Sequence, residues 1–140
     1  MNPGIEHFVN LLNELQFKTT DSGDGRTHEF ECDRAYPYTV VLVTPDTLLK
    51  EAVNLLDTLR NLGFYPVPVH PDGQEGLTDK EVEVDPGLCY LGGDNFLAII
   101  DIRFSMNFDV KQHLIDQRQK KMPSNFAEAF DKVFGIIDGN

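Results

Sequence analysis

Tryptophan is absent from this chain, cysteine occurs only twice, and no apolar run approaches the ~18 residues of a membrane-spanning helix. Residues 1–6 lack the basic and then apolar pattern of a secretory signal. Two cysteines exclude a disulfide-rich scaffold, and we interpret Cys32 and Cys89 as small buried hydrophobes, with a disulfide or a reactive thiol as the alternative. We therefore expect a cytoplasmic protein without contact to a membrane.

The sequence also lacks a recognisable set of catalytic or metal-binding residues. Histidine occurs at four scattered positions, and His28 and Cys32 are the closest approach to a ligand pair. On a strand, residues four positions apart are separated by about 13 Å, so both cannot bind one ion. No serine lies on a glycine elbow. We expect no metal, no cofactor and no catalytic residue, and we favour a non-enzymatic protein while leaving enzymatic activity open.

Basic residues are few, and their scarcity is uneven along the chain. Lysine and arginine total 12 against 23 carboxylates, which gives a net charge of −11. The stretch from Asp21 to Asp101 accounts for all of it, with 16 acidic and 5 basic residues. Such a field repels nucleic acid backbones and attracts basic protein surfaces. Direct nucleic-acid binding is therefore not expected, although an acidic run can also be only a solvated face.

What the chain does contain indicates a packed core. Hydrophobic residues make up 41% of the sequence, ten of them phenylalanine, and no linker or internal repeat interrupts the pattern. We predict a single globular domain over residues 1–140. Its class is α/β (α+β), with a mixed, mainly antiparallel sheet of about 4–6 strands packed by about 4 helices.

The hydrophobic periodicity places these elements along the chain. Helices are predicted from Asn2-Pro3 to about residue 15, from Thr44-Pro45 to Leu62-Gly63, over residues 108–121, and from Pro123 onward. The apolar residues that the second helix carries are Leu48, Leu49, Ala52, Val53, Leu56 and Leu59. Strands are predicted at 27–32, 38–43, 64–69 (an edge strand because of its two prolines), 81–84, and as a hairpin of 88–91 with 96–104.

The segment most typical of a binding site is Thr19-Thr20-Asp21-Ser22-Gly23-Asp24-Gly25-Arg26, followed by His28. Gly23 and Gly25 would let the backbone approach a ligand. The hydroxyls of Thr19, Thr20 and Ser22 would donate hydrogen bonds to that ligand, and Arg26 could bridge a phosphate. The spacing matches neither a phosphate-binding loop, nor a dinucleotide fingerprint, nor an EF-hand. The same residues also form ordinary turns, so the segment is predicted to be either a ligand-binding loop or a turn between helix and strand.

Two further groups of charged residues are candidates. Asp101 and Arg103 share one face of a predicted strand and resemble the acidic arm of some metal-dependent nucleases, but arginine replaces the expected lysine. We favour an ion pair at the rim of the sheet. Arg118, Lys120 and Lys121 end the third helix, where cations suit the helix dipole, and a docking patch for phosphate or an acidic partner is the alternative.

The run from Leu15 to Gly25, followed by Phe30-Glu31-Cys32 and Tyr36-Pro37-Tyr38, resembles a group of small, uncharacterised proteins encoded by bacteriophages and prophages. In that group a helix ends at a Thr-x-Asp-Ser-Gly-Asp-Gly segment, and a strand and an acidic second half follow. The resemblance covers about the first third of the chain and carries no assigned activity. It implies a phage accessory protein in the cytoplasm of the host cell, and proteins of this kind commonly block a host target, including host defence.

Together these features predict a small acidic binding protein that sequesters or inhibits a host target. In one variant, residues 19–26 and His28 capture a small nucleotide; in the other, the acidic middle of the chain docks on a basic host protein surface. The alternatives are an acidic escort chaperone, a small metal-dependent enzyme using Asp101, or a phage structural component. Assembly into a homo-oligomer stays open.

Overall fold

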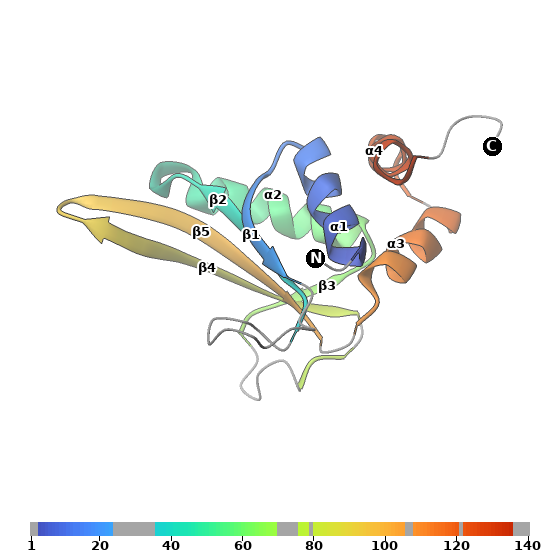
Figure 1. Ribbon diagram of the computed structural model, residues 1–140, viewed down its shortest axis with the longest axis horizontal. Helices are drawn as coiled ribbons and strands as arrows, with labels where there is room; N and C mark the ends of the chain where they lie inside the picture. The colour runs from blue at the N-terminus through green and yellow to red at the C-terminus, as the bar shows by residue number, and fades with distance from the viewer. Residues whose placement is uncertain are drawn as a thin grey trace.

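The computed structural model describes residues 3–23, 36–69, 76–78, 80–105, 108–120 and 122–135 (Figure 1). They form one α/β domain with four α-helices and five strands in a single mixed, mostly antiparallel sheet. The predicted fold class is confirmed. None of the described helices combines the length and apolar character needed to cross a membrane.

The elements follow one another as α1 (Pro3–Glu14), β1 (Lys18–Gly23), β2 (Tyr38–Val43), a 3-10 turn η1 (Pro45–Thr47), α2 (Leu48–Asn61), β3 (Tyr65–Val67), β4 (Glu81–Gly92), β5 (Asn95–Phe104), α3 (Val110–Gln119) and α4 (Ser124–Phe134). Most predicted elements are confirmed. The strand predicted at 27–32 lies outside the described residues. The separate strands expected at 81–84 and 88–91 are one strand, β4, which continues through Pro86 and Gly87.

The strand order across the sheet is β1-β2-β5-β4-β3. Only the β3–β4 pair is parallel; the other three neighbouring pairs are antiparallel. β2 and β3 consequently run in the same direction and are joined by α2, with β5 and β4 lying between them. Because β3 is three residues long and pairs only with Glu81–Glu83, most of β4 has no described strand on its other side.

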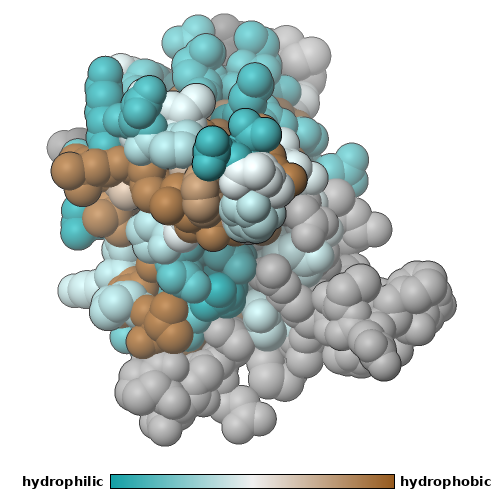
Figure 2. All heavy atoms as spheres, turned by 90° about the vertical axis from the view of Figure 1, so that its left-hand side faces the viewer, coloured by the Kyte–Doolittle hydropathy of each residue, from teal (hydrophilic) through white to brown (hydrophobic). Residues whose placement is uncertain are grey.

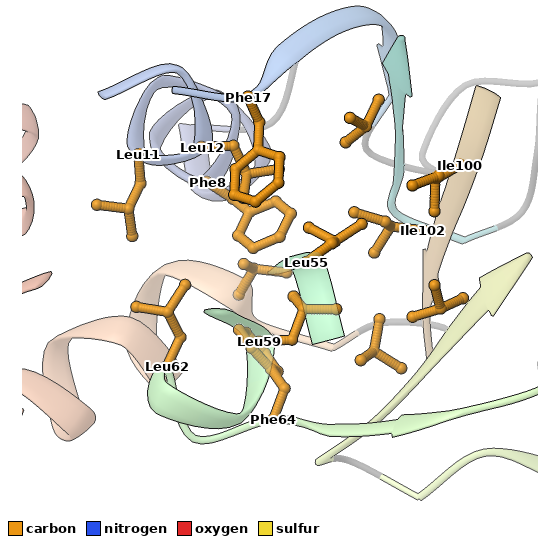
Figure 3. Packing of buried hydrophobic residues seen from close by; sticks show 14 of the residues in the cluster. Phe8, Leu11, Leu12, Phe17, Leu55, Leu59, Leu62, Phe64, Ile100 and Ile102 are labelled. Carbon is orange, nitrogen blue, oxygen red and sulfur yellow. The ribbon is translucent and has the colours of Figure 1, made fainter. Parts of the chain in front are cut away.

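The core lies between one face of the sheet and the helices (Figures 1 and 3). On β5 this face carries Ala98, Ile100, Ile102 and Phe104, all without exposed surface. Phe8 of α1 packs edge-on against the rings of Phe64 and Phe104, at centroid distances of 5.9 and 5.0 Å. Figure 3 shows α1, α2 and the sheet contributing side chains to one cluster. A single core is what a domain of this size needs.

Only some of the apolar residues of α2 are buried. Leu55 and Leu59 are fully buried and Leu48, Ala52 and Leu56 partly so, but Leu49 and Val53 are exposed. The row 48, 52, 55, 59, 62 follows the 3.6-residue period and faces the sheet. Leu49 and Val53 form a second apolar row beside it. The apolar arc of α2 is therefore wider than the surface that covers it.

Candidate functional site

The glycine-rich segment is a strand in its described half. Thr19, Thr20, Asp21, Ser22 and Gly23 belong to β1, which pairs with β2 as far as Gly23 opposite Tyr38. The prediction of a turn or loop is therefore wrong for these five residues. The edge of β2 that does not pair with β5 offers hydrogen-bond partners to the backbone of these residues. This pairing outweighs their weak local preference for a turn.

Two details of β1 bear on the proposed ligand site. The register shifts between Thr19 and Asp21, which is a β-bulge that leaves Thr20 without a partner residue on β2. The hydroxyl of Thr19 donates to the side-chain oxygen of Asn13 at the end of α1, at 3.2 Å. Asp24, Gly25, Arg26 and His28 lie outside the described residues. The binding role of the segment stays a prediction.

The second candidate, Asp101 with Arg103, is an ion-pair cluster in the middle of the sheet. On the face opposite the helices, the guanidinium of Arg103 donates to Glu83 at 2.9 Å, to Asp85 at 2.9 Å and to Asp101 at 3.1 Å. The expected ion pair is present, but β5 is the central strand, so its position at a sheet rim was wrong. The register explains the cluster, because Glu83 lies opposite Arg103 and Asp85 opposite Asp101.

This cluster has the character of a structural clamp. The side chain of Glu83 is completely buried and that of Asp101 nearly so, while Arg103 is 17% exposed. Burial alone would lower the pKa of Arg103, but its hydrogen bonds with Glu83, Asp85 and Asp101, together with the charge of Asp101, raise it above the ordinary value. The guanidinium occupies the point where the three carboxylates converge. Among the described residues, no group of histidine, cysteine and carboxylate side chains has the arrangement of a metal site.

The basic residues at the end of α3 separate into two roles. Arg118 forms a bidentate pair with Asp131 of α4, at 2.9 and 3.0 Å, and so fastens α3 to α4. Lys120 instead lines a hollow of about 660 Å³ beside the end of α2, which is described further below. Lys121 lies outside the described residues. Arg118 and Lys120, which were predicted to belong to one patch, therefore have separate roles.

The most distinctive surface is the end of the β4–β5 hairpin, which extends past the other strands at the left of Figure 1. The last β2–β5 pair joins Val43 to Ala98, and Ala98 pairs with Leu88 on β4. We call the hairpin beyond that point, residues 88–97, the arm. Its loop is Gly93-Asp94, between the paired residues Gly92 and Asn95. Gly93 has φ +59°, which suits glycine at the first position of a tight hairpin loop.

The arm continues the apolar face of the core beyond the helices that cover it. Leu88 pairs with Ala98 and Tyr90 with Phe96, so these side chains share the face that carries Ile100 and Phe104 deeper in the sheet. Here the apolar side chains are exposed, and so are two on α2. The exposed fractions lie between 50% and 79% for Leu49, Val53, Leu88, Tyr90, Leu91 and Phe96. Figure 2 shows apolar surface gathered in a band at this end of the molecule.

Comparison of the chain with protein-family models, curated proteins and solved structures finds no match. The resemblance to bacteriophage proteins therefore stays a prediction, and the site has to be argued from its own geometry.

Sequence analysis identified the hairpin but not its role. The sequence did contain a signal for this surface. Leu88, Tyr90 and Phe96 continue the apolar alternation of β4 and β5 up to the loop, and a strand end that lies in water does not need apolar side chains at these positions. Whether a helix covers those positions is decided by how far each strand reaches past its neighbours. That length difference is a property of the folded sheet.

Proposed function

We propose that this protein is a non-enzymatic binding protein that docks through the arm and the start of α2 on a partner protein. The observation that carries the proposal is the band of exposed apolar side chains at this end of the domain (Figure 2). Exposed apolar side chains gathered on one surface mark interaction sites, whereas single ones are ordinary. Tyr90 and Phe96 are the natural anchors, because large rigid rings dominate interface energetics.

The arm is held stiffly enough to act as a docking element. The rings of Tyr90 and Phe96 contact each other across the hairpin at a centroid distance of 5.3 Å. Cross-strand aromatic pairs of this kind stabilise a hairpin by about 0.2–1 kcal/mol. At its root, the arm continues into the centre of the sheet, where Arg103 ties β4 to β5. A preformed element loses less conformational freedom when it binds.

The charges around this surface define the chemistry of the partner. The arm, residues 88–97, contains one carboxylate, Asp94, and no lysine or arginine. Asp94 lies exposed in the loop of the arm and Asp46 lies exposed ahead of α2. The complementary partner is a protein surface with an apolar centre and lysine or arginine around it. Occupying such a surface would block other ligands from it, as expected of an inhibitor.

Leu49 offers a matched pair of variants for the test. Its side chain is 79% exposed on α2, so either Leu49→Lys or Leu49→Glu should leave the fold intact. Both remove apolar contact, but only lysine opposes a basic partner. We expect Leu49→Lys to weaken binding about tenfold and Leu49→Glu several-fold less than that. Val69→Ser, which removes an equally apolar exposed side chain away from the arm, is the control.

The measurement is calorimetry with purified partners. Host proteins captured by the wild type and not by a Leu88→Ser/Phe96→Ser variant are purified, and their affinities for the wild type and the Leu49 variants are compared at two salt concentrations. Equal affinity of Leu49→Lys and Leu49→Glu would contradict a basic partner. Sedimentation of the wild type as a dimer that the arm variant dissociates would show that the arm binds a second copy instead, and the proposal would fail.

A further inference from the structure

A hollow of about 660 Å³ lies where the end of α2, the start of β3 and the end of α3 meet. Its walls come from segments far apart in the sequence. The lining residues are Arg60, Gly63, Phe64, Tyr65, Pro66, Lys80, Gln117 and Lys120. We call this hollow the groove. It is separate from the docking surface: none of its lining residues belongs to the arm, and Arg60 lies eleven residues from Leu49 on α2, about 16 Å along the helix axis.

The groove gathers positive charge in an acidic protein. Arg60, Lys80 and Lys120 all line it, and no carboxylate is among the described residues that do so. Arg60 also contacts Asp57 at 3.3 Å, but both side chains are more than half exposed, and such a surface pair contributes little. In a chain with almost twice as many carboxylates as cations, three converging cations make a local site for an anion.

Two contacts bring the segments that carry these cations together. The backbone N–H of Tyr65 donates to the carbonyl of Lys80 at 2.7 Å, which fixes the backbone of Lys80 beside β3. The Nε2–H of His113 in α3 donates to the carbonyl of Leu62 at 3.0 Å, which fixes α3 against the end of α2. Lys120 is the C-cap residue directly after α3 and lines the same hollow. The fold therefore fixes the backbones of Lys80 and Lys120 beside the groove.

His113 lies beside the groove, where it contacts Leu62 at the end of α2 and the ring of Phe64. Its ring is buried and stacked on Phe64 at a centroid distance of 4.2 Å. Burial lowers the pKa of His113, and the charges of Lys80 and Lys120 lower it further, against the opposing effects of the Leu62 carbonyl and Asp116. The fields of two lysines that lie far apart in sequence thus reach one point beside the groove.

The groove also presents an aromatic surface. Tyr65 lines it with a side chain that is 70% exposed, and Phe64 lies next to it with its ring in the core. A planar ring beside clustered cations suits a ligand that combines an aromatic system with a negatively charged group. The volume falls in the range of small-molecule sites.

We propose that the groove binds a small aromatic phosphate of the mononucleotide class, with Arg60, Lys80 and Lys120 holding the phosphate and Tyr65 stacking on the base. This places a nucleotide site away from the glycine-rich segment around Arg26, where the sequence predicted one. It is also independent of the docking function of the arm.

The test is calorimetry at low ionic strength with adenosine 5′-monophosphate, adenosine and inorganic phosphate. We expect the nucleotide to bind more tightly than either fragment. Lys80→Ala and Lys120→Ala should each weaken nucleotide binding about tenfold, because each removes a charge-assisted hydrogen bond. Tyr65→Ala should weaken it about fivefold or more, and Tyr65→Phe should retain it. The control is Lys111→Ala, which removes the same charge at the other end of α3, about 13 Å away.

A second readout is the ring resonance of His113 in NMR spectra, which should shift when the nucleotide binds and stay unchanged with adenosine alone. Four results would overturn the proposal. They are no binding at millimolar nucleotide, equal weakening by Lys111→Ala, inorganic phosphate binding as tightly as the nucleotide, and an acidic peptide binding where the nucleotide does not. Loss of nucleotide binding in Arg26→Ala, with Lys80→Ala unaffected, would assign the ligand to the glycine-rich segment instead.

Discussion

The two ends of α2 face opposite kinds of surroundings. Near its start, Leu49 and Val53 lie exposed, and exposed carboxylates lie ahead of α2 at Asp46 and in the loop of the arm at Asp94. At its finish, Arg60 lines a groove with Lys80 and Lys120. The net charge of −11 therefore conceals a cationic site as well as an acidic surface. The net charge of the whole chain therefore does not predict what each site binds, because each site has its own local electrostatic field.

The strongest way to break the comparison is to remove the clamp of Arg103, whose partners on β4 lie between Lys80 of the groove and Leu88 of the arm. Arg103→Met leaves Glu83 and Asp101 without the guanidinium that contacts them, and both carboxylates are almost entirely buried. Removing one partner of a buried ion pair costs about 3–5 kcal/mol. Urea unfolding followed by circular dichroism should show a loss of this size.

The matched control for that experiment is Arg103→Lys. It keeps a cation but cannot present the fork of donors that reaches three carboxylates, so its loss of stability should be intermediate. A free energy of unfolding for Arg103→Met within 1 kcal/mol of the wild type would mean that the cluster is not a clamp.

A smaller effect is expected at Gly63, which forms one side of the groove. Gly63 has φ +85° at the end of α2. Its backbone N–H donates to the carbonyl of Arg60, and the N–H of Phe64 donates to the carbonyl of Leu59. This pattern of helix termination favours glycine. A Cβ at Gly63 would also overlap the side-chain amide of Gln117. Gly63→Ala should therefore cost roughly 1–2 kcal/mol in urea unfolding.

Two variants separate the causes of that cost. Gly63→Ala combined with Gln117→Ala should recover the part of the lost stability that comes from the overlap with Gln117, and it should leave the part that comes from the positive φ at residue 63. Gln16 ends α1 in the same way with φ +77°, so Gln16→Gly should raise the free energy of unfolding by roughly 0.5–1 kcal/mol. No gain from Gln16→Gly would show that the backbone conformation costs little at either helix end.

The smallest effect is the dependence of the free energy of unfolding on pH through His113, which lies beside the groove. Because the folded-state pKa of His113 is lowered, the unfolded chain takes up a proton more readily, below about pH 6.5. The contribution of neutral His113 to stability is complete above that pH and is lost as the pH falls toward the folded-state value. His113→Gln keeps a donor for the Leu62 carbonyl and cannot titrate.

The free energy of unfolding of the wild type should therefore fall relative to His113→Gln between pH 7.5 and 5.5, by less than about 1.4 kcal/mol per pH unit. Parallel curves for the two proteins would contradict a lowered pKa. A lowering that disappears when Lys80 and Lys120 are both replaced by alanine would assign the effect to the groove cations rather than to burial.

Local patterns predicted the elements well where period and caps agree. The hydrophobic stripes of α1 and α4, the Thr44-Pro45 start and Gly63 end of α2, and the hairpin loop are all consequences of nearest-neighbour chemistry. Prediction was wrong at Thr19–Gly23, because pairing with β2 compensates for small polar residues. The helical pattern also did not separate the exposed Leu49 and Val53 from the buried row of α2, because such a pattern does not specify how wide a surface will cover the helix.

By itself, the sequence determined the fold class, the acidic character and the ion pair of Asp101 with Arg103, since each depends on residue type and short spacing. Only the tertiary structure decided which apolar residues stay in water and which cations meet. Arg60, Lys80 and Lys120 converge because the end of α2, the start of β4 and the end of α3 meet at one place, and the arm is exposed because β4 and β5 extend past β2. Both facts follow from the lengths and packing of elements that are distant in the chain, and no local pattern records them.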